Sequence, residues 1–163
     1  MASGDGPRPL RRRDMGNAAA ALMVACLVVR PAMSAAAEGG DAAAASAGLY
    51  ADMSARNLPD VLRFIPAQGI TEIGPDTNQV HRLTAKAFED LFKSPLLIDL
   101  RMEGMQVQAL GTVAVVTGTR IGSITIPDIV PIEERQLATL VWLKVGDQWK
   151  LQHIHLSAPP VVK

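Results

Sequence analysis

Cysteine is nearly absent from this chain of 163 residues, in which Cys26 is the only one. A single thiol excludes a disulfide framework. Because Cys26 lies in an N-terminal segment that we interpret as a targeting device, the rest of the chain also lacks a thiolate site. A domain of this size can fold without disulfides, since it is long enough to bury an adequate core.

Neither sign of charge predominates, because 16 Lys and Arg are matched by 16 Asp and Glu. Residues 1–37 hold five Arg and two Asp, and the rest of the chain holds 11 basic and 14 acidic residues. The body of the protein is therefore mildly acidic and has no basic stripe, which argues against nucleic acid as a partner. A P-loop, a nucleophile elbow and a dinucleotide fingerprint are missing as well.

The apolar run at residues 18–29 is too short to span a bilayer comfortably. It follows the basic stretch RPLRRR and precedes the small-residue stretch AMSAAAEGG, an order typical of a signal peptide. We therefore predict a signal peptide at residues 1–37, export to the periplasm or the medium, and a mature chain without a transmembrane segment. Two alternatives stay open: a buried N-terminal helix, and a lipoprotein anchored at Cys26 through the sequence LMVAC.

The first half of the remaining chain shows helical patterns. Residues 38–48 are of low complexity and are interpreted as a flexible leader that runs into a helix. Apolar spacing predicts helices at about 44–56, 59–64 and 85–93, with Thr84 as N-cap of the third. A short strand is expected at 70–73, followed by a loop.

The second half is predicted to be β-structure. Alternating or Val- and Thr-rich segments indicate strands near residues 96–104, 111–120, 135–145 and 148–157. Residues 121–134 are expected to form an irregular connection, and Gly146-Asp147 is expected to form a two-residue hairpin turn. The order predicts an α+β fold, a cone in which three N-terminal helices pack on one face of a strongly curved antiparallel sheet and leave a pocket.

The hairpin turn fixes which side chains share a face. With Gly146-Asp147 as the turn, Trp142 faces Leu151, and the same register carried further places His153 and His155 on the face of Trp142. The opposite face would then carry Leu137, Val141, Leu143, Ile154 and Leu156. Both faces are largely apolar, so we expect helices on one and a second copy on the other, giving a homodimer or larger oligomer. A bulge would reverse these assignments.

The last hairpin resembles that of the nuclear-transport-factor-2-like superfamily, particularly its SnoaL-like members and the association domain of calcium/calmodulin-dependent protein kinase II. The matching residues are Thr139, Val141, Trp142, Trp149, His153, His155 and Ser157. The resemblance covers residues 49–158 and leaves 159–163 as a tail. It implies a cystatin-like cone, and a fold shared by isomerases, cyclases, dehydratases and purely binding or oligomerising domains.

Several positions depart from the pattern that the resemblance implies. Leu140 and Leu156 stand where the kinase association domain has arginines, so binding of a small carboxylate does not carry over. Gly74 stands where related ketosteroid isomerases have a catalytic aspartate. Glu72, two residues earlier, could replace it only by reaching further, and Tyr50 is roughly where that family has its oxyanion donor.

The candidate catalytic residues are Glu72, His153, His155 and Tyr50. The candidate ligand-binding residues are Tyr50, Phe64, Leu140, Trp142, His153 and His155. Two histidines at i and i+2 on a strand could share a metal, but no third ligand has a defined spacing. We therefore predict no metal and no cofactor.

Three functions remain open at this point. The first is an exported domain that binds a small hydrophobic or amphipathic molecule in its pocket and oligomerises through its sheet without catalysis. The second is a small isomerase, cyclase or dehydratase that uses a pocket carboxylate and a histidine. The third is a pure oligomerisation module. The convergence of Glu72 and the histidines on one cavity would favour the enzyme.

Overall fold

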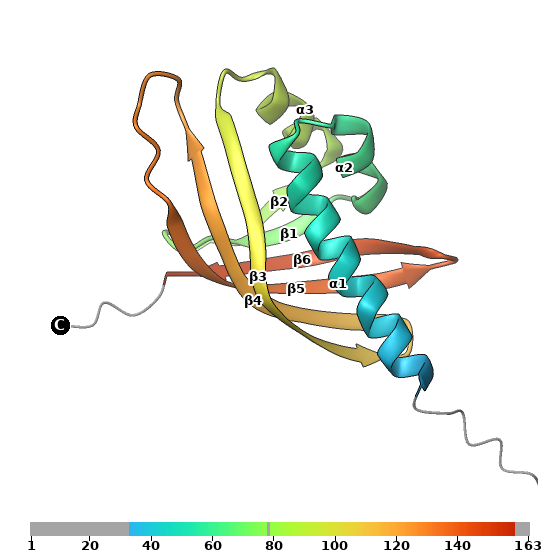
Figure 1. Ribbon diagram of the computed structural model, residues 1–163. Helices are drawn as coiled ribbons and strands as arrows, with labels where there is room; N and C mark the ends of the chain where they lie inside the picture. The colour runs from blue at the N-terminus through green and yellow to red at the C-terminus, as the bar shows by residue number, and fades with distance from the viewer. Residues whose placement is uncertain (1–32, 78, 159–163) are drawn as a thin grey trace, which may run out of the picture.

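The computed structural model describes residues 33–77 and 79–158. The chain forms a long helix, two short helices and a six-stranded sheet, as Figure 1 shows. The helices are α1 (Met33–Ser54), α2 (Leu58–Phe64) and α3 (Ala85–Lys93). The strands are β1 (Ile70–Ile73), β2 (His81–Leu83), β3 (Leu97–Leu110), β4 (Val113–Thr125), β5 (Glu134–Val145) and β6 (Gln148–Ser157). This is the predicted α+β fold.

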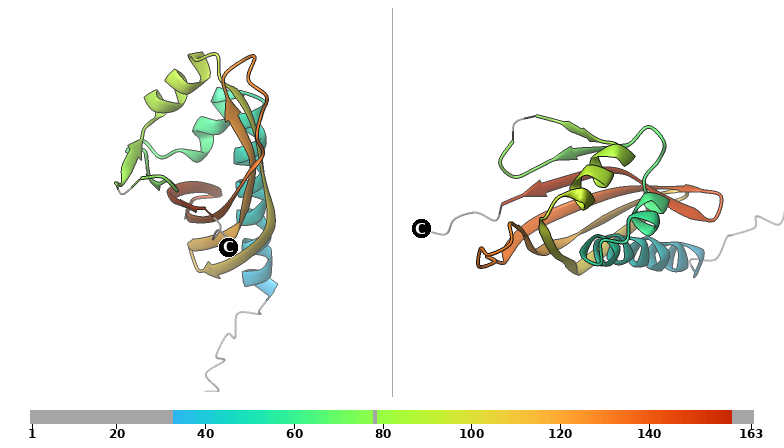
Figure 2. Two further views of the ribbon diagram at one scale, coloured as in Figure 1. Left: turned by 90° about the vertical axis from the view of Figure 1, so that its left-hand side faces the viewer. Right: turned by 90° about the horizontal axis from the view of Figure 1, so that it is seen from above.

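The sheet has the order β2-β1-β6-β5-β4-β3. Strands β3 to β6 are joined as antiparallel neighbours, whereas β1 runs parallel to β6. The sheet is strongly curled, and α3 stands over the opening that the curl leaves (Figure 2). None of the helices in the described ranges is long and apolar enough to cross a membrane.

Two glycines mark where β3 and β4 bend. Gly104 has φ of +61° and lies at a register shift between Glu103 and Gln106. Gly122 has φ of +129°, and a Cβ there would lie 1.8 Å from the carbonyl oxygen of Asp99. At Gly122 only glycine tolerates this conformation and this close approach, and at Gly104 the left-handed φ favours glycine. The two glycines therefore help to specify the curvature of the sheet.

Helix α1 corrects the expectation of a flexible leader. Residues 38–48 belong to α1, where Ala42 and Ser46 are fully buried and Gly39 lies against Val107 of β3. Alanine has the highest helix propensity, and small side chains let the helix approach the sheet closely, so a low-complexity composition here builds core. Of the predicted signal peptide, residues 1–32 lie outside the described residues, as does the 159–163 tail.

Two strand assignments also differ from the expectation. Residues 121–125, expected to be irregular, continue β4, because they pair with the beginning of β3 from Leu97 onward. The loop after β1 contains β2, a short edge strand in which Leu83 pairs with Ile70. Both segments take their strand structure from pairing with another strand, which their own residue patterns do not reveal.

Arg56 holds the helices in place around the opening of the cone. It follows α1 with φ of +54° and donates hydrogen bonds to the carbonyl oxygens of Ser94, at 2.8 Å, and of Phe92 and Leu96. Its guanidinium also lies over the Phe92 ring. One side chain therefore ties the end of α1 to the end of α3 and the start of β3, which fixes α3 over the concave face.

Candidate functional site

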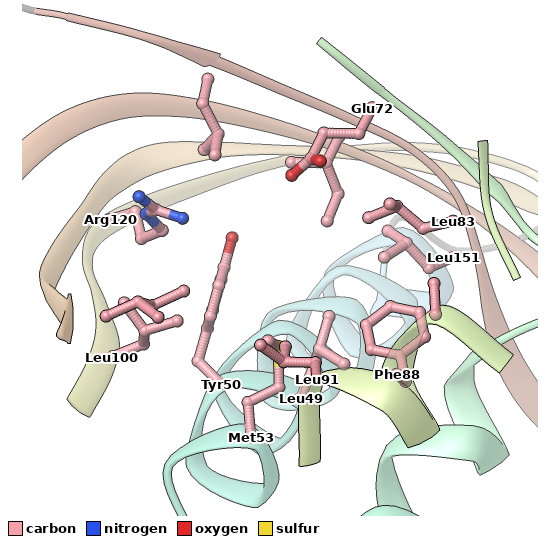
Figure 3. Close-up of a pocket in the computed structure, with 14 residues that line it drawn as sticks. Leu49, Tyr50, Met53, Glu72, Leu83, Phe88, Leu91, Leu100, Arg120 and Leu151 are labelled. Carbon is pink, nitrogen blue, oxygen red and sulfur yellow. The ribbon is translucent and has the colours of Figure 1, made fainter. Parts of the chain in front are cut away.

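A cavity of about 300 Å³ lies between α1, α3, the β1–β2 pair and the concave face of the sheet. Its walls are mostly apolar, and three polar side chains break them, as Figure 3 shows. The cavity is lined by Leu49, Tyr50, Met53, Glu72, Leu83, Ala87, Phe88, Leu91, Leu100, Arg120, Ile124, Leu151, Ile154 and Leu156. An apolar hollow with a few convergent polar groups is the usual form of a small-molecule site.

Tyr50 points from α1 into the cavity, with its hydroxyl directed toward the space between Arg120 and Glu72 (Figure 3). The residue is 3% exposed, and its hydroxyl has no hydrogen-bond partner within the described residues. Burial raises the pKa of Tyr50 to about 12, while the charge of Arg120 lowers that pKa and the charge of Glu72 raises it to smaller extents. The phenol is therefore a neutral hydrogen-bond donor at ordinary pH.

Arg120 brings the cation of the site from the middle of β4. Its side chain is 15% exposed, and its nearest carboxylate oxygen belongs to Glu134, at 3.9 Å. Within the described residues its guanidinium makes no hydrogen bond. A largely buried guanidinium with free N–H groups beside an unpaired phenol presents several donors to whatever occupies the cavity.

Glu72 lies on β1, the strand that runs parallel to the end of β6. It pairs with Ile154 of β6 and with His81 of β2, and its carboxylate reaches the cavity wall (Figure 3). The resemblance described in the sequence analysis already pointed to Glu72 and to Tyr50, and both residues line this cavity.

Sequence reasoning missed Arg120 as a pocket residue. The strand that contains Arg120 was predicted to end at this residue, with an irregular connection after it. With β4 running to Thr125, Val116, Arg120 and Ile124 follow the alternation of one face, and Val116 is fully buried in the core. An arginine in phase with core positions was the signal that could have identified it.

The histidines correct the expectation that they share the face of Trp142. The register shifts between Val141 and Trp142, so that Trp142 pairs with Leu151 while Val141 pairs with His153. Gln152 is the extra residue of this bulge, and every β6 side chain after it changes face. Ile154 and Leu156 consequently line the cavity, although they were expected on the opposite face.

Both histidines lie on the convex face of the sheet. His153 is half-buried, and its Nδ1 lies 2.8 Å from the hydroxyl of Thr71. His155 is exposed and pairs with Thr139. Neither lines the cavity that holds Tyr50 and Glu72.

The other candidate ligand-binding residues lie away from the cavity. Leu140 and Trp142 are fully buried core residues. The indole nitrogen of Trp142 donates a 2.9 Å hydrogen bond to Ser46, and its ring meets Phe64 edge-on at 5.7 Å. Phe64 also lines a shallow second hollow beside Trp149. Large aromatic side chains here fill the narrow end of the cone rather than the pocket.

The site offers oxygen and nitrogen donors but no clustered metal ligands. Within residues 33–77 and 79–158 no group of three or more His, Cys, Asp or Glu side chains could hold a metal ion. The chemistry available is hydrogen-bond donation by Tyr50 and Arg120 and proton acceptance by Glu72.

Comparison with known families places this fold and pocket in a defined group. The SnoaL-like domain family matches residues 40–161, so the chain belongs to that family. No curated protein sequence matches the chain.

Solved structures of the nuclear-transport-factor-2-like type have the same fold. A proposed dehydratase from Streptomyces avermitilis superposes with a TM-score of 0.65 at 16% identity, covering 77% of this chain and 99% of its own. The association domain of calcium/calmodulin-dependent protein kinase II from C. elegans gives a TM-score of 0.60 at 16% identity, with 77% and 98% covered. A nuclear-transport-factor-2-like protein of unknown function from Pseudomonas putida gives 0.60 at 16% identity, with 76% and 88% covered. At these identities the similarity concerns the fold.

Proposed function

We propose that the domain binds a small amphipathic molecule in the cavity, with its polar group at Tyr50, Arg120 and Glu72 and its apolar body against the leucine-rich wall. The observation that carries this proposal is the buried hydroxyl of Tyr50, which has no hydrogen-bond partner among the described residues and lies beside the Arg120 guanidinium. The nearest carboxylate oxygen to that guanidinium, on Glu134, is 3.9 Å away. A buried polar group without a partner costs about 1–3 kcal/mol, a cost that a ligand acceptor removes.

The charges around the cavity favour a neutral polar group over a carboxylate. Arg120 has Glu134 at 3.9 Å on one side and faces Glu72 across the cavity, while Tyr50 is neutral. An anionic ligand would add another negative charge beside two carboxylates. A carbonyl oxygen instead accepts hydrogen bonds from Tyr50 and Arg120 without that repulsion.

The proposal is tested by analysing which small molecules co-purify with the untagged domain. Mass spectrometry of extracts should find one compound class with wild-type protein and a reduced amount with the double variant Tyr50→Phe/Arg120→Met. The matched control, His155→Gln, changes the convex face and should retain the wild-type amount. Equal recovery from all three proteins would contradict the proposal.

A second function, acid–base catalysis, is favoured by a specific observation. Glu72, a potential general base, and Tyr50, a potential donor to a developing oxyanion, line the same cavity. The histidine in the expected isomerase, cyclase or dehydratase scheme would have to be replaced, since His153 and His155 lie on the convex face. Turnover of a bound compound that is lost in Glu72→Gln, with binding retained, would establish the enzyme over the binding protein.

We also propose that the convex face assembles the protein into a homodimer or larger oligomer. Leu137, Val141 and Leu143 lie on this face, and Leu137 is 53% exposed. In the described chain the helices cover only the other face. Apolar sheet faces of this kind mark contact surfaces. A protein that assembles but binds no small molecule would instead be an oligomerisation module.

Export remains our proposal for the location of the domain, supported by the order of basic, apolar and small residues at 1–37. A chain that begins at Glu38 keeps the buried positions Ala42 and Ser46 of α1 and should fold. N-terminal sequencing of exported protein should start between Ala35 and Asp41. A lipidated start at Cys26 would replace this with a membrane-anchored form, and a retained Met1 would overturn export.

A further inference from the structure

The wall of the cavity meets the surface at Ile124, near the end of β4, and the connection between β4 and β5 that follows exposes apolar side chains. Ile124 is the one exposed residue among those that line the cavity, at 41%. Beyond it, Ile126 and Ile129 are 61% and 60% exposed. In Figure 1 this connection extends past the end of the sheet on which α3 also stands.

The exposed connection is held at both of its ends. A turn closes its first part, with the amide of Ile129 donating to the carbonyl oxygen of Ile126 at 3.3 Å. At its base, Glu133 accepts a 3.1 Å hydrogen bond from Arg101 of β3. The apolar side chains therefore occupy a defined surface, which with Ile124 we call the rim track (Ile124, Ile126 and Ile129).

The cavity is small compared with most ligand pockets. Its volume of about 300 Å³ is at the lower end of the roughly 300–1,000 Å³ of ligand pockets. At roughly 30 Å³ for a water-sized group, it holds about ten non-hydrogen atoms. A longer ligand has to leave the cavity, and where it leaves past Ile124 it meets the rim track.

We propose that the ligand is a chain-type amphiphile longer than the cavity, whose polar end lies at Tyr50 and Arg120 and whose hydrocarbon chain leaves past Ile124 onto the rim track. This inference rests on the proposed binding function and names its ligand class. The inference rests on the continuity of the cavity wall with the exposed surface, because Ile124 belongs to both. Between Ile126 and Glu134 the connection contains Asp128 and Glu133 but no Lys or Arg, so an anionic membrane surface is a poor alternative partner.

The experiment is a series of methyl ketones from 2-hexanone to 2-tetradecanone, titrated into the protein and followed by NMR. Each methylene buried in the cavity should tighten binding about fourfold, which is the effect of about 0.8 kcal/mol per buried methylene. Beyond about ten non-hydrogen atoms we expect about twofold per methylene, because the rim track covers a chain on one side only.

The variant Ile126→Ser/Ile129→Ser should bind 2-hexanone like the wild type and lose the increments of the longer ketones. The matched control is Leu110→Ser, which alters a 67% exposed leucine where β3 turns into β4, at the other end of the sheet (Figure 1). It should leave the whole series unchanged.

The failures are distinguishable. If short ketones bind but affinity stops rising at about ten non-hydrogen atoms in the wild type, the chain-type ligand is wrong and the pocket proposal stands. If no ketone of any length binds, the pocket proposal itself fails. If Ile126→Ser/Ile129→Ser changes the sedimentation coefficient from that of the wild-type oligomer, the rim track contacts a second copy, and the inference is overturned.

Discussion

The indole nitrogen of Trp142 donates a hydrogen bond to the hydroxyl of Ser46, 96 residues earlier in the chain, at 2.9 Å. Both residues are fully buried, and Ser46 in turn donates to the carbonyl oxygen of Ala42. This contact fixes α1 on the concave face of the sheet. Because Tyr50 lies one turn further along α1, the contact also fixes the position of Tyr50 in the pocket wall.

Ser46→Ala should lower the free energy of unfolding by about 1–3 kcal/mol, because it leaves the Trp142 nitrogen buried without an acceptor. Urea denaturation measures the change. Ala44→Ser, at an exposed position of the same helix, should stay within about 0.5 kcal/mol of wild type. An unchanged stability in Ser46→Ala would show that α1 does not hold this position in solution.

Tyr50→Phe should leave the ligand-free protein as stable as the wild type or more stable, because it removes a buried hydroxyl that has no hydrogen-bond partner among the described residues. A structural tyrosine would behave in the opposite way. The same substitution should weaken ligand binding, which would show stability given up for function. Denaturation without ligand and binding of a ketone probe measure the two effects.

The stability of the wild type should fall steeply as the pH rises from about 10 to 12. Burial raises the pKa of Tyr50 from 10.0 to about 12 in the folded protein, so the unfolded chain loses this proton first. Below pH 10 the phenol is neutral in both states and adds no pH dependence. Between about pH 10 and 12 the unfolded chain ionises while the folded protein does not, which lowers the free energy of unfolding by an amount on the order of 1–3 kcal/mol. Tyr50→Phe should lack this part of the decline, and identical pH profiles for the two proteins would contradict the burial of the hydroxyl.

The fold could be predicted from the sequence because its main signals are local. Apolar spacing located α2 and α3, and the turn at Gly146-Asp147 forms as expected, with Gly146 at φ of +60°. The prediction of a flexible leader at residues 38–48 was wrong, because composition alone cannot distinguish a flexible Ala-rich segment from a helix whose small residues pack on a sheet.

The site could be predicted only in part. Tyr50 and Glu72 were found through positions shared with a known fold. The histidines were placed on the wrong face because the bulge at Gln152 has no signal in the sequence, and one extra residue reverses every later assignment. Arg120 was missed because the end of β4 depends on its pairing with β3.

Val141→Lys should convert the proposed oligomer into a folded monomer, because Val141 lies on the convex face and is half-buried there. Leu140→Lys, one residue away, points into the fully buried core and should unfold the chain. Light scattering and circular dichroism separate the two outcomes. Wild-type protein that is monomeric at micromolar concentration would contradict assembly.

His153→Gln and His155→Gln should bind a ketone probe with wild-type affinity, because neither histidine lines the cavity. His153→Gln should cost about 1 kcal/mol of stability through loss of the hydrogen bond to Thr71, whereas the exposed His155 should cost less. Loss of binding in either variant, with the fold intact, would show that the substituted histidine contributes to the ligand site.

The most direct test of the pocket is an NMR titration of 2-octanone into the wild type and into two variants, in each of which one alanine of α3 is replaced by phenylalanine. Ala87 lines the cavity, and Ala85, two residues earlier on the same helix, is exposed. Ala87→Phe fills the cavity and should weaken binding at least about tenfold, corresponding to about 1.4 kcal/mol, while Ala85→Phe should bind like the wild type. Equal affinity in Ala87→Phe and the wild type, or no binding to the wild type, would contradict a ligand site built on Tyr50, Glu72 and Arg120.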